Sequence, residues 1–225
     1  MMARPRPAEL TGPVEDYLKA VYDIELGGAA ATTSDLATRL RVAPASVSGM
    51  VRRLADQGLL AHEPYRGVRL TAAGRRAALR TLRRHRVIES YLTQALGYPW
   101  DRVHEEAERL EHAASDELID RMAQAIGEPR FDPHGAPIPT RDGAVAEPAS
   151  RPLAELAVGQ AARVLRVRDD DPALLRYVDE LTLRPGTRLT LVARAPYGGP
   201  LTVEVAGREQ RIGPELAAEI RVVEE

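Results

Sequence analysis

The 225-residue chain contains no cysteine, so disulfides, thiolate metal sites, iron–sulfur clusters and a cysteine nucleophile are excluded. Aromatic residues make up only 4% of it, with one Trp and one Phe, which is too few for a stacking platform that binds single-stranded nucleic acid or sugars. It has no uncharged apolar run of about 18 residues, and no apolar segment follows the charges of MMARPRPAEL. We therefore expect a cytoplasmic protein with no membrane partner.

The charge of the chain is unevenly distributed, although the net value is only −2. Residues 1–90 hold 15 basic and 9 acidic side chains, whereas the remainder holds 16 basic and 24 acidic ones. A basic first part joined to an acidic remainder favours an anion-binding module attached to a domain with another task. Chance remains an alternative explanation, because almost every basic residue is Arg.

The first 72 residues predict a winged helix-turn-helix. Apolar residues recur at helical spacing in three segments: 13–26, 34–40 and 45–58. Thr33 or Ser34 can cap the second helix, and Gly58 ends the third. LLAHEPYRGVRLT then indicates two short strands around a turn at Pro64 to Gly67. In this arrangement the third helix can enter the major groove and the hairpin can touch the DNA backbone.

The remainder predicts helices, a linker and a small β domain. Residues 72–96 form a long helical segment, and Asp101 can cap another helix that continues to about Ala125. Prolines and glycines then dominate, and short alternating runs follow from Leu153 onward, with a short helix at about 172–180. The expected domains are a DNA-binding domain (1–72), a helical metal-binding and dimerisation domain (73–128), a Pro-rich linker (129–152) and a small β-barrel (153–225).

The stretch DRVHEEAERLEHAASDE carries the most informative side chains. On a continuous helix four of them share an arc of about 100°: His104, Glu108, Glu111 and His112. The preceding helix adds His85 and Glu89 at the i, i+4 spacing, on one face. Imidazole nitrogens and carboxylate oxygens at the junction of two helices can surround a divalent ion.

Other interpretations of this stretch remain open. Glu-rich helices with an occasional His are commonly solvated faces that bind nothing. A winged-helix regulator that senses an organic ligand would leave these faces merely solvated. A metal-dependent hydrolase is a further alternative, although the chain has no HExxH, GxSxG or P-loop motif.

An ordered set of motifs resembles the diphtheria toxin repressor family of metal-dependent regulators. The motifs are VEDYLKAVYDIE, SDLATRLRVAPASVSGMVRRL, HRVIESYL, VHEEAERLEH and DPHGAPIPT, and the match covers nearly the whole chain. The resemblance implies a winged helix, a helical metal-binding dimerisation domain and a C-terminal Src-homology-three-like β-barrel. It also implies a transcription regulator rather than an enzyme.

The family's primary metal site is carried over here to Asp16, Glu108, Glu111 and His112. In the iron-responsive branch the first two positions are Met and Cys, so two soft sulfur ligands have become hard oxygens. This change favours Mn²⁺ and is similar to the manganese-responsive branch. Since raw affinity rises toward later divalent metals, Fe²⁺, Co²⁺ and Zn²⁺ are also expected to bind in vitro.

The family's ancillary site resembles His85, Glu89 and His104, completed by a side chain from the barrel. Motif alignment favours Asp171 for that role, with Asp169 and Asp170 as alternatives. Lys19 lies one turn beyond Asp16, where some manganese regulators have a carboxylate. A cation there disfavours a closely spaced binuclear cluster, so we expect separate primary and ancillary sites.

The resemblance also implies the DNA-contacting residues, namely Thr33, Ala43, Pro44, Ser46, Ser48, Arg53 and Arg66. Hydroxyls and helix N-terminal amides can hold phosphates, and Arg side chains can hold phosphates or enter a groove. A helix-capping role is the alternative for Ser46.

The sequence therefore predicts a homodimeric, Mn²⁺-dependent repressor that binds double-stranded operator DNA and controls metal homeostasis genes. The expected mechanism is that metal fixes the angle between the DNA-binding and dimerisation domains, so that two recognition helices match their half-sites. An Fe²⁺-dependent repressor of iron uptake and a winged-helix regulator that senses a non-metal ligand are the alternatives.

Overall fold

A computed structural model describes residues 10–63 and 65–225; Pro64, which we predicted in the hairpin turn, lies outside the described residues. The chain divides into two compact units, each described by itself. The first unit contains the residues up to Arg84 together with Glu111–Ala114 and Pro139–Ala144. The second contains His85–Leu110, Ser115–Ile138 and Val145–Glu225.

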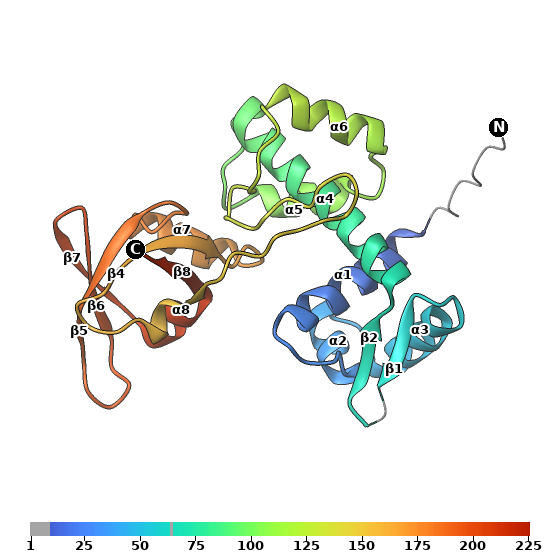
Figure 1. The fold of residues 1–225 in the computed structure, drawn as a ribbon, viewed down its shortest axis with the longest axis horizontal. Coiled ribbons are helices and arrows are strands. Elements are labelled where there is room, and N and C mark those ends of the chain that lie inside the picture. Colours follow the sequence, from blue (N-terminus) through green and yellow to red (C-terminus); the bar gives the residue numbers. More distant parts are fainter. Residues whose placement is uncertain (1–9, 64) are drawn as a thin grey trace. The chain divides into compact units, whose positions relative to one another are not determined.

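The first unit is the winged helix-turn-helix predicted from the sequence (Figure 1). Its elements are α1 (Gly12–Leu26), α2 (Thr33–Leu40), α3 (Pro44–Asp56), β1 (Leu60–Glu63), β2 (Gly67–Leu70) and the start of α4 (Ala72–Leu96). The core is formed by side chains that recur at helical spacing on the inner faces, among them Leu18, Leu36 and Leu54, all fully buried. Each such leucine contributes about 1.5–3 kcal/mol of burial free energy.

The start of α2 differs from the prediction. Thr32, rather than Thr33 or Ser34, is the N-cap: its hydroxyl accepts a hydrogen bond from the backbone N–H of Asp35 at 3.1 Å. The Asp35 carboxylate accepts in return from the backbone N–H of Thr32, which completes a capping box. The reciprocal pair needs an acidic side chain three residues after the cap, and only Thr32 has one there.

The hairpin is fixed at its base. β1 and β2 pair antiparallel, with Leu60 opposite Leu70. The backbones of Ala31 and Val68 exchange two hydrogen bonds of 2.9 Å, which join β2 to the segment before α2. Gly67 is required at this contact, because a Cβ atom there would lie 2.2 Å from the carbonyl oxygen of Ala31.

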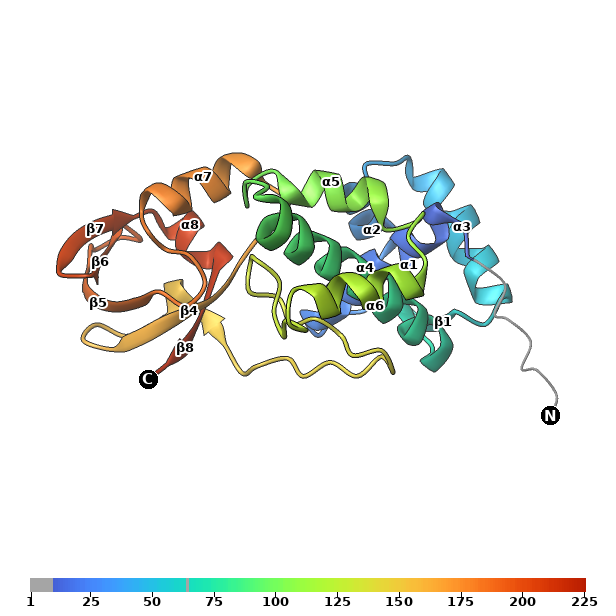
Figure 2. The same ribbon diagram turned by 90° about the horizontal axis from the view of Figure 1, so that it is seen from above.

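In the second unit the predicted helix between Asp101 and Ala125 is two helices, α5 (Val103–Leu110) and α6 (Asp116–Ala125) (Figure 2). The interruption has a local cause, because the Ser115 hydroxyl accepts a hydrogen bond from the backbone N–H of Leu118 and caps a new helix. Glu111 and His112 consequently lie beyond the end of α5, so the four-residue arc expected on one continuous helix does not form.

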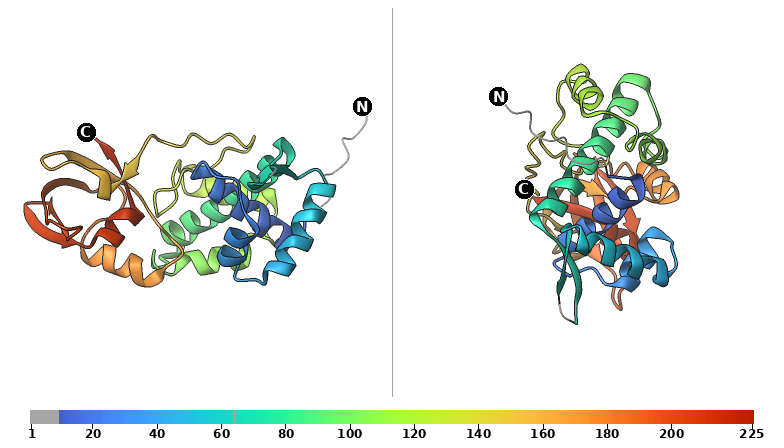
Figure 3. Two further views of the ribbon diagram at one scale, coloured as in Figure 1. Left: turned by 90° about the horizontal axis from the view of Figure 1, so that it is seen from below. Right: turned by 90° about the vertical axis from the view of Figure 1, so that its right-hand side faces the viewer.

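The C-terminal part is the expected small β-barrel, seen in orange and red in Figure 3. Its elements are β3 (Arg151–Pro152), a 3₁₀ turn (Leu153–Glu155), β4 (Ala161–Val167), α7 (Pro172–Glu180), β5 (Arg188–Arg194), β6 (Leu201–Val205), β7 (Arg208–Ile212), α8 (Pro214–Glu219) and β8 (Ile220–Glu224). The strand order is β3-β8-β4-β5-β6-β7. Trp100, from the segment before α5, is buried in the barrel's apolar core. No helix among the described residues is long and apolar enough to cross a membrane.

Before β3 begins, the Pro-rich segment has no helix and only an isolated bridge between Phe131 and Pro137. Its middle nevertheless packs on the barrel. The backbone N–H of Val167 donates to the carbonyl of His134 at 2.9 Å. A Cβ atom at Gly135, whose φ is +90°, would lie 1.9 Å from the carbonyl oxygen of Leu165. This contact places His134 against β4 of the barrel.

Candidate metal centres and nucleic-acid interface

The first unit brings together Asp16, Glu111 and His112, three of the predicted primary ligands. Their ligand atoms all lie within 4.8 Å of one another. The Nε2 atom of His112 is 2.9 Å from Asp16 Oδ1 and 3.5 Å from Glu111 Oε1. Two ligands at right angles around an octahedral ion, each about 2.1 Å from it, are about 3.0 Å apart, so this spacing suits one divalent ion. Two carboxylates and one imidazole form a predominantly oxygen donor set without sulfur.

Glu15, which the sequence did not single out, orients the histidine of this group. Its Oε2 accepts a hydrogen bond from His112 Nδ1 at 2.7 Å, so the proton sits on Nδ1 and the lone pair of the neutral ring is on Nε2. Arg84 of α4 in turn donates to Glu15 Oε1 at 3.3 Å. Burial disfavours the charged ring, but the Glu15 hydrogen bond and the charges of Asp16 and Glu111 outweigh it and raise the pKa of His112.

Lys19 lies beside the same group and pairs with Glu111. Its Nζ donates to Glu111 Oε1 at 2.7 Å, and the Glu111 side chain is fully buried. A buried carboxylate needs a compensating charge, and Lys19 supplies one at the same Glu111 oxygen that lies 3.5 Å from His112 Nε2. The position where a second metal would require a further carboxylate therefore holds an ammonium group.

The second unit brings together the predicted ancillary ligands His85, Glu89 and His104. His85 Nε2 is 3.0 Å from Glu89 Oε1 and 3.1 Å from His104 Nδ1, and His104 Nδ1 is 3.2 Å from Glu89 Oε1. Three donor atoms about 3 Å apart match one face of an octahedron around a divalent ion. Burial opposes its charge, but His85, His104 and a third histidine, His134, hold the pKa of Glu89 well below its usual range.

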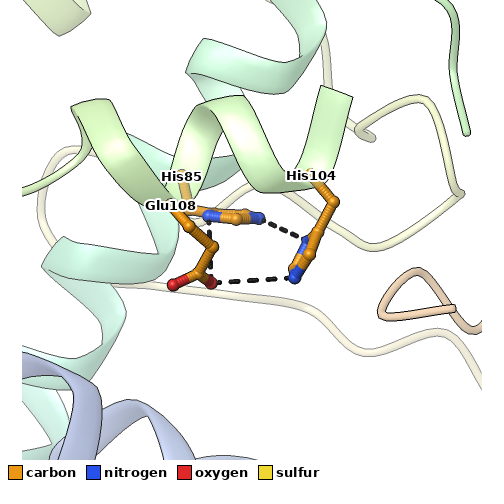
Figure 4. A group of neighbouring side chains, drawn as sticks. All are labelled: His85, His104 and Glu108. Atoms are coloured by element: carbon orange, nitrogen blue, oxygen red, sulfur yellow. Dashed lines mark hydrogen bonds and ion pairs between the residues drawn. The ribbon is translucent and has the colours of Figure 1, made fainter. Parts of the chain in front are cut away.

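Glu108, predicted as a primary ligand, lies instead in the second unit, beside His85 and His104 (Figure 4). Its Oε1 is 3.7 Å from His85 Nδ1 and 3.7 Å from His104 Nε2. These are the ring nitrogens that do not face Glu89. The two imidazoles thus lie between a buried carboxylate and a partly exposed one.

His134 was not predicted as a ligand, although it belongs to the motif DPHGAPIPT. It groups with Glu89 and Asp169, whose ligand atoms lie within 4.8 Å of one another. Its Nε2 donates to the carbonyl of Trp100 at 2.7 Å, so the neutral ring has its lone pair on Nδ1, 3.7 Å from Glu89 Oε1. Among the described residues no hydrogen bond reaches this buried Nδ1 atom or the buried Oε2 atom of Glu89. The available signal was a histidine between Pro133 and Gly135 in a Pro-rich segment.

The three adjacent aspartates of the barrel have different roles. Asp171 is the N-cap of α7, because its Oδ1 accepts from the backbone N–H groups of Ala173 and Leu174 at 2.9 and 3.2 Å. Asp170 pairs with Arg168. Asp169 is the one that lies with Glu89 and His134. The structure thus favours the alternative Asp169 over Asp171 as the barrel's contribution.

The predicted DNA-contacting residues lie at the start of α2, along α3 and in the hairpin. Ala43 is the N-cap residue of α3 without a side-chain cap bond, and Pro44 opens the helix. Ser46 and Arg53 are exposed. No cap bond from the Ser46 hydroxyl is recorded, so its capping alternative has no support. The remaining members have local partners or are half-buried: Ser48, bonded to the Pro44 carbonyl, Arg66, paired with Glu63, and Thr33 at the start of α2.

Three family models together match most of the chain. Residues 9–68 match the N-terminal DNA-binding domain of iron-dependent repressors, and residues 71–140 match their metal-binding and dimerisation domain. Residues 151–224 match the FeoA domain. The first two models describe domains of repressors, so the hydrolase alternative is wrong.

Curated relatives and solved structures agree with these models. The iron-dependent repressor IdeR of Mycobacterium tuberculosis is 32% identical over 228 residues, which cover 95% of this chain and 98% of the relative. The diphtheria toxin repressor of Corynebacterium diphtheriae is 28% identical over 229 residues, 96% and 99% of the two chains. A structure described as a manganese-dependent transcriptional repressor in complex with manganese is 39% identical, with a TM-score of 0.87 over 94% of this chain and 100% of that one. The structure of T. acidophilum IdeR is 30% identical, with a TM-score of 0.79 over 99% and 100%. The chain therefore belongs to the diphtheria toxin repressor and IdeR family of metal-dependent transcriptional repressors.

Proposed function

We propose that this repressor is activated by Mn²⁺, binds double-stranded operator DNA as a homodimer and controls genes of metal homeostasis. The observation that carries the proposal is the donor set of Asp16, Glu111 and His112. Carboxylate oxygens suit Mn²⁺, whereas the sulfur ligands of the iron-responsive branch suit softer metals. The similar structure described as a manganese-dependent repressor in complex with manganese supports the same metal.

Activation follows from where the donor atoms lie in the chain. Asp16 belongs to α1, which contributes Leu18 and Val21 to the buried core, whereas Glu111 and His112 follow α5. An ion held by all three residues ties α1 to a segment about 95 residues further along the chain. Metal coordination then orders the DNA-binding residues before DNA binds, so the free-energy cost of ordering them no longer weakens DNA binding.

We propose that the second unit binds metal independently of this switch. His85, Glu89 and His104 are spaced for one ion, and Glu89, His134 and Asp169 form a neighbouring candidate group that uses a barrel residue. Metal here would join α4, the Pro-rich segment and the barrel. Substitution of these ligands should lower the stability of the second unit and should have only a small effect on the affinity for DNA.

The proposal is tested with metal-free protein and with duplexes selected from a random library by the manganese-loaded protein. Fluorescence anisotropy should show tight binding with Mn²⁺ and weak binding with chelator. Asp16→Ala should lose the Mn²⁺-dependent gain, whereas Asp23→Ala should keep it, because Asp23 on the same helix pairs with Arg39 and lies outside the donor set. Equal Mn²⁺-dependent binding by Asp16→Ala and wild type would contradict the proposal.

Iron is the second candidate activator, because the curated relative IdeR is an iron-dependent repressor. Anaerobic titration of the same duplex with Fe²⁺ and Mn²⁺ separates the two metals. Because the donor atoms are mainly oxygens, we expect Mn²⁺ to activate DNA binding at micromolar free concentrations. A chelator buffer sets these concentrations. Activation by Fe²⁺ alone would transfer the proposal to iron.

A further inference from the structure

Gly12, the first residue of α1, lies against the imidazole ring of His112. A Cβ atom at position 12 would be 3.2 Å from Cδ2 of that ring, 3.2 Å from Cγ and 3.6 Å from Nε2. The two shorter distances are below the separation of about 3.5–4.0 Å at which carbon atoms attract each other best. The ring therefore occupies space that a side chain at position 12 would also need.

The ring has little freedom to move away from such a side chain. Its Nδ1 donates to Glu15 Oε2 at 2.7 Å, and its Nε2 lies 2.9 Å from Asp16 Oδ1. Gly12, Glu15 and Asp16 are spaced i, i+3 and i+4, so they share one face of α1. This face of the helix therefore contacts both nitrogens of the His112 ring and, at Gly12, leaves room for its carbon atoms.

Pro13 offers another explanation for a glycine at position 12. A residue before proline is disfavoured in the helical region, because the proline ring approaches its N–H group and its Cβ atom. Gly12 is helical and has no Cβ atom, so it avoids part of this clash. The two explanations make different predictions, because the first requires the ring of His112 and the second requires only Pro13.

We propose that Gly12 is a positioning residue that fixes the place of the His112 ring in the metal site of the first unit. The inference rests on the proposed Mn²⁺-dependent function and adds a residue that is not itself a ligand. A methyl group at position 12 would displace the ring by a few tenths of an ångström. Metal–ligand distances in proteins vary by only about 0.2 Å, so Nε2 would no longer fit one ion together with Asp16 and Glu111.

Gly49, in α3, offers a matched control. It is also a helical glycine, and no atom of the described residues lies within 4 Å of the Cβ atom that an alanine would carry there. Gly49→Ala therefore adds the same methyl group to a helix of the first unit without a close contact. Because alanine is a better helix former than glycine, this variant should keep or raise the thermal midpoint.

The first measurement is calorimetric titration of the full-length protein with Mn²⁺, in which Asp16→Ala identifies the binding step of the first unit. Gly12→Ala should lower the Mn²⁺ affinity of that step about tenfold, whereas Gly49→Ala should leave it unchanged. Wild-type affinity of Gly12→Ala would overturn the inference. If Asp16→Ala removes no binding step from the titration, the proposed function itself is contradicted.

The second measurement is thermal unfolding of the metal-free protein, which separates the effect of the ring from that of Pro13. In the wild-type background Gly12→Ala should lower the thermal midpoint, because the methyl group meets the ring of His112. In the His112→Ala background the ring is absent, so Gly12→Ala should leave the midpoint unchanged. An equal loss in both backgrounds would overturn the inference, because Pro13 alone would then explain the glycine.

Discussion

Glu15 accepts a hydrogen bond from Nδ1 of His112 at 2.7 Å, which leaves Nε2 of the same ring 2.9 Å from Asp16. The carboxylate thus selects the ring tautomer whose lone pair faces the proposed metal. Arg84 holds Glu15 from the other side, at 3.3 Å. Residues on α1, on α4 and after α5 are therefore connected by one chain of polar contacts.

Removing the Glu15 charge should weaken metal binding without removing a ligand. Glu15→Gln is expected to lower Mn²⁺ affinity of the first unit about 10–100-fold, because the amide no longer fixes the ring as strongly. Calorimetric titration of Mn²⁺ measures this loss. Glu117→Gln on α6 removes an exposed carboxylate paired with Arg121 and should leave the affinity unchanged. Equal affinities for the two variants would show that Glu15 does not orient His112.

Lys19 should limit the first unit to one ion. Lys19→Glu replaces the ammonium 2.7 Å from Glu111 with a further carboxylate, so one more Mn²⁺ per chain is expected than in wild type. Lys19→Met removes the positive charge without adding a ligand and should leave the count unchanged. Native mass spectrometry of the manganese-loaded variants counts the ions. An unchanged count in Lys19→Glu would mean that Lys19 does not decide the stoichiometry.

Gly135 should be essential for the segment that carries His134. In Gly135→Ala the new methyl group would meet the carbonyl oxygen of Leu165 at 1.9 Å in a backbone with φ +90°, so the free energy of unfolding should fall by about 1–3 kcal/mol or more. Gly143→Ala, at φ +78° with no atom within 4 Å of the new methyl, is the control for backbone strain alone. Thermal and denaturant unfolding compare them, and an equal loss in both variants would refute the close contact.

The DNA surface should respond to charge at α3 and at the hairpin. Arg53→Ala and Arg66→Ala are each expected to weaken binding and to reduce the slope of log affinity against log salt by about one. Ser46→Ala should weaken binding without changing that slope. Arg188→Ala on the barrel, which removes an exposed arginine paired with Glu225, is the matched control. If neither the α3 variant nor the hairpin variant changes the slope of log affinity against log salt, DNA must bind to another surface of the protein.

Local patterns predicted the order of elements in the first unit. The apolar stripe of α1, the stop at Gly58 and the 25-residue span of α4 follow from spacing and from helix-ending residues. The break between α5 and α6 was not predicted, because Val103 to Ala125 keeps a helical apolar period throughout and only the Ser115 cap interrupts it. Periodicity gives the face of a helix but not its continuity.

The candidate sites were predictable where ligands lie within one helix turn. The pairing of His85 with Glu89 is such a case, since the i, i+4 spacing fixes it. The grouping of Glu108 and His104 with His85, and of Asp169 with Glu89 and His134, depends on how segments far apart in sequence pack. Glu15 and Lys19 are neighbours of Asp16 in sequence, yet their contacts with His112 and Glu111 arise only in the folded first unit.

The central claim is that one Mn²⁺ ion is held by Asp16, Glu111 and His112, and an anomalous difference map at the manganese edge tests it most directly. In crystals of the manganese-loaded protein we expect a peak bonded to one oxygen of Asp16, one of Glu111 and Nε2 of His112, with Glu15 still on Nδ1. A loaded structure with manganese in the second unit only, and with Asp16 bonded to no ion, would contradict the account.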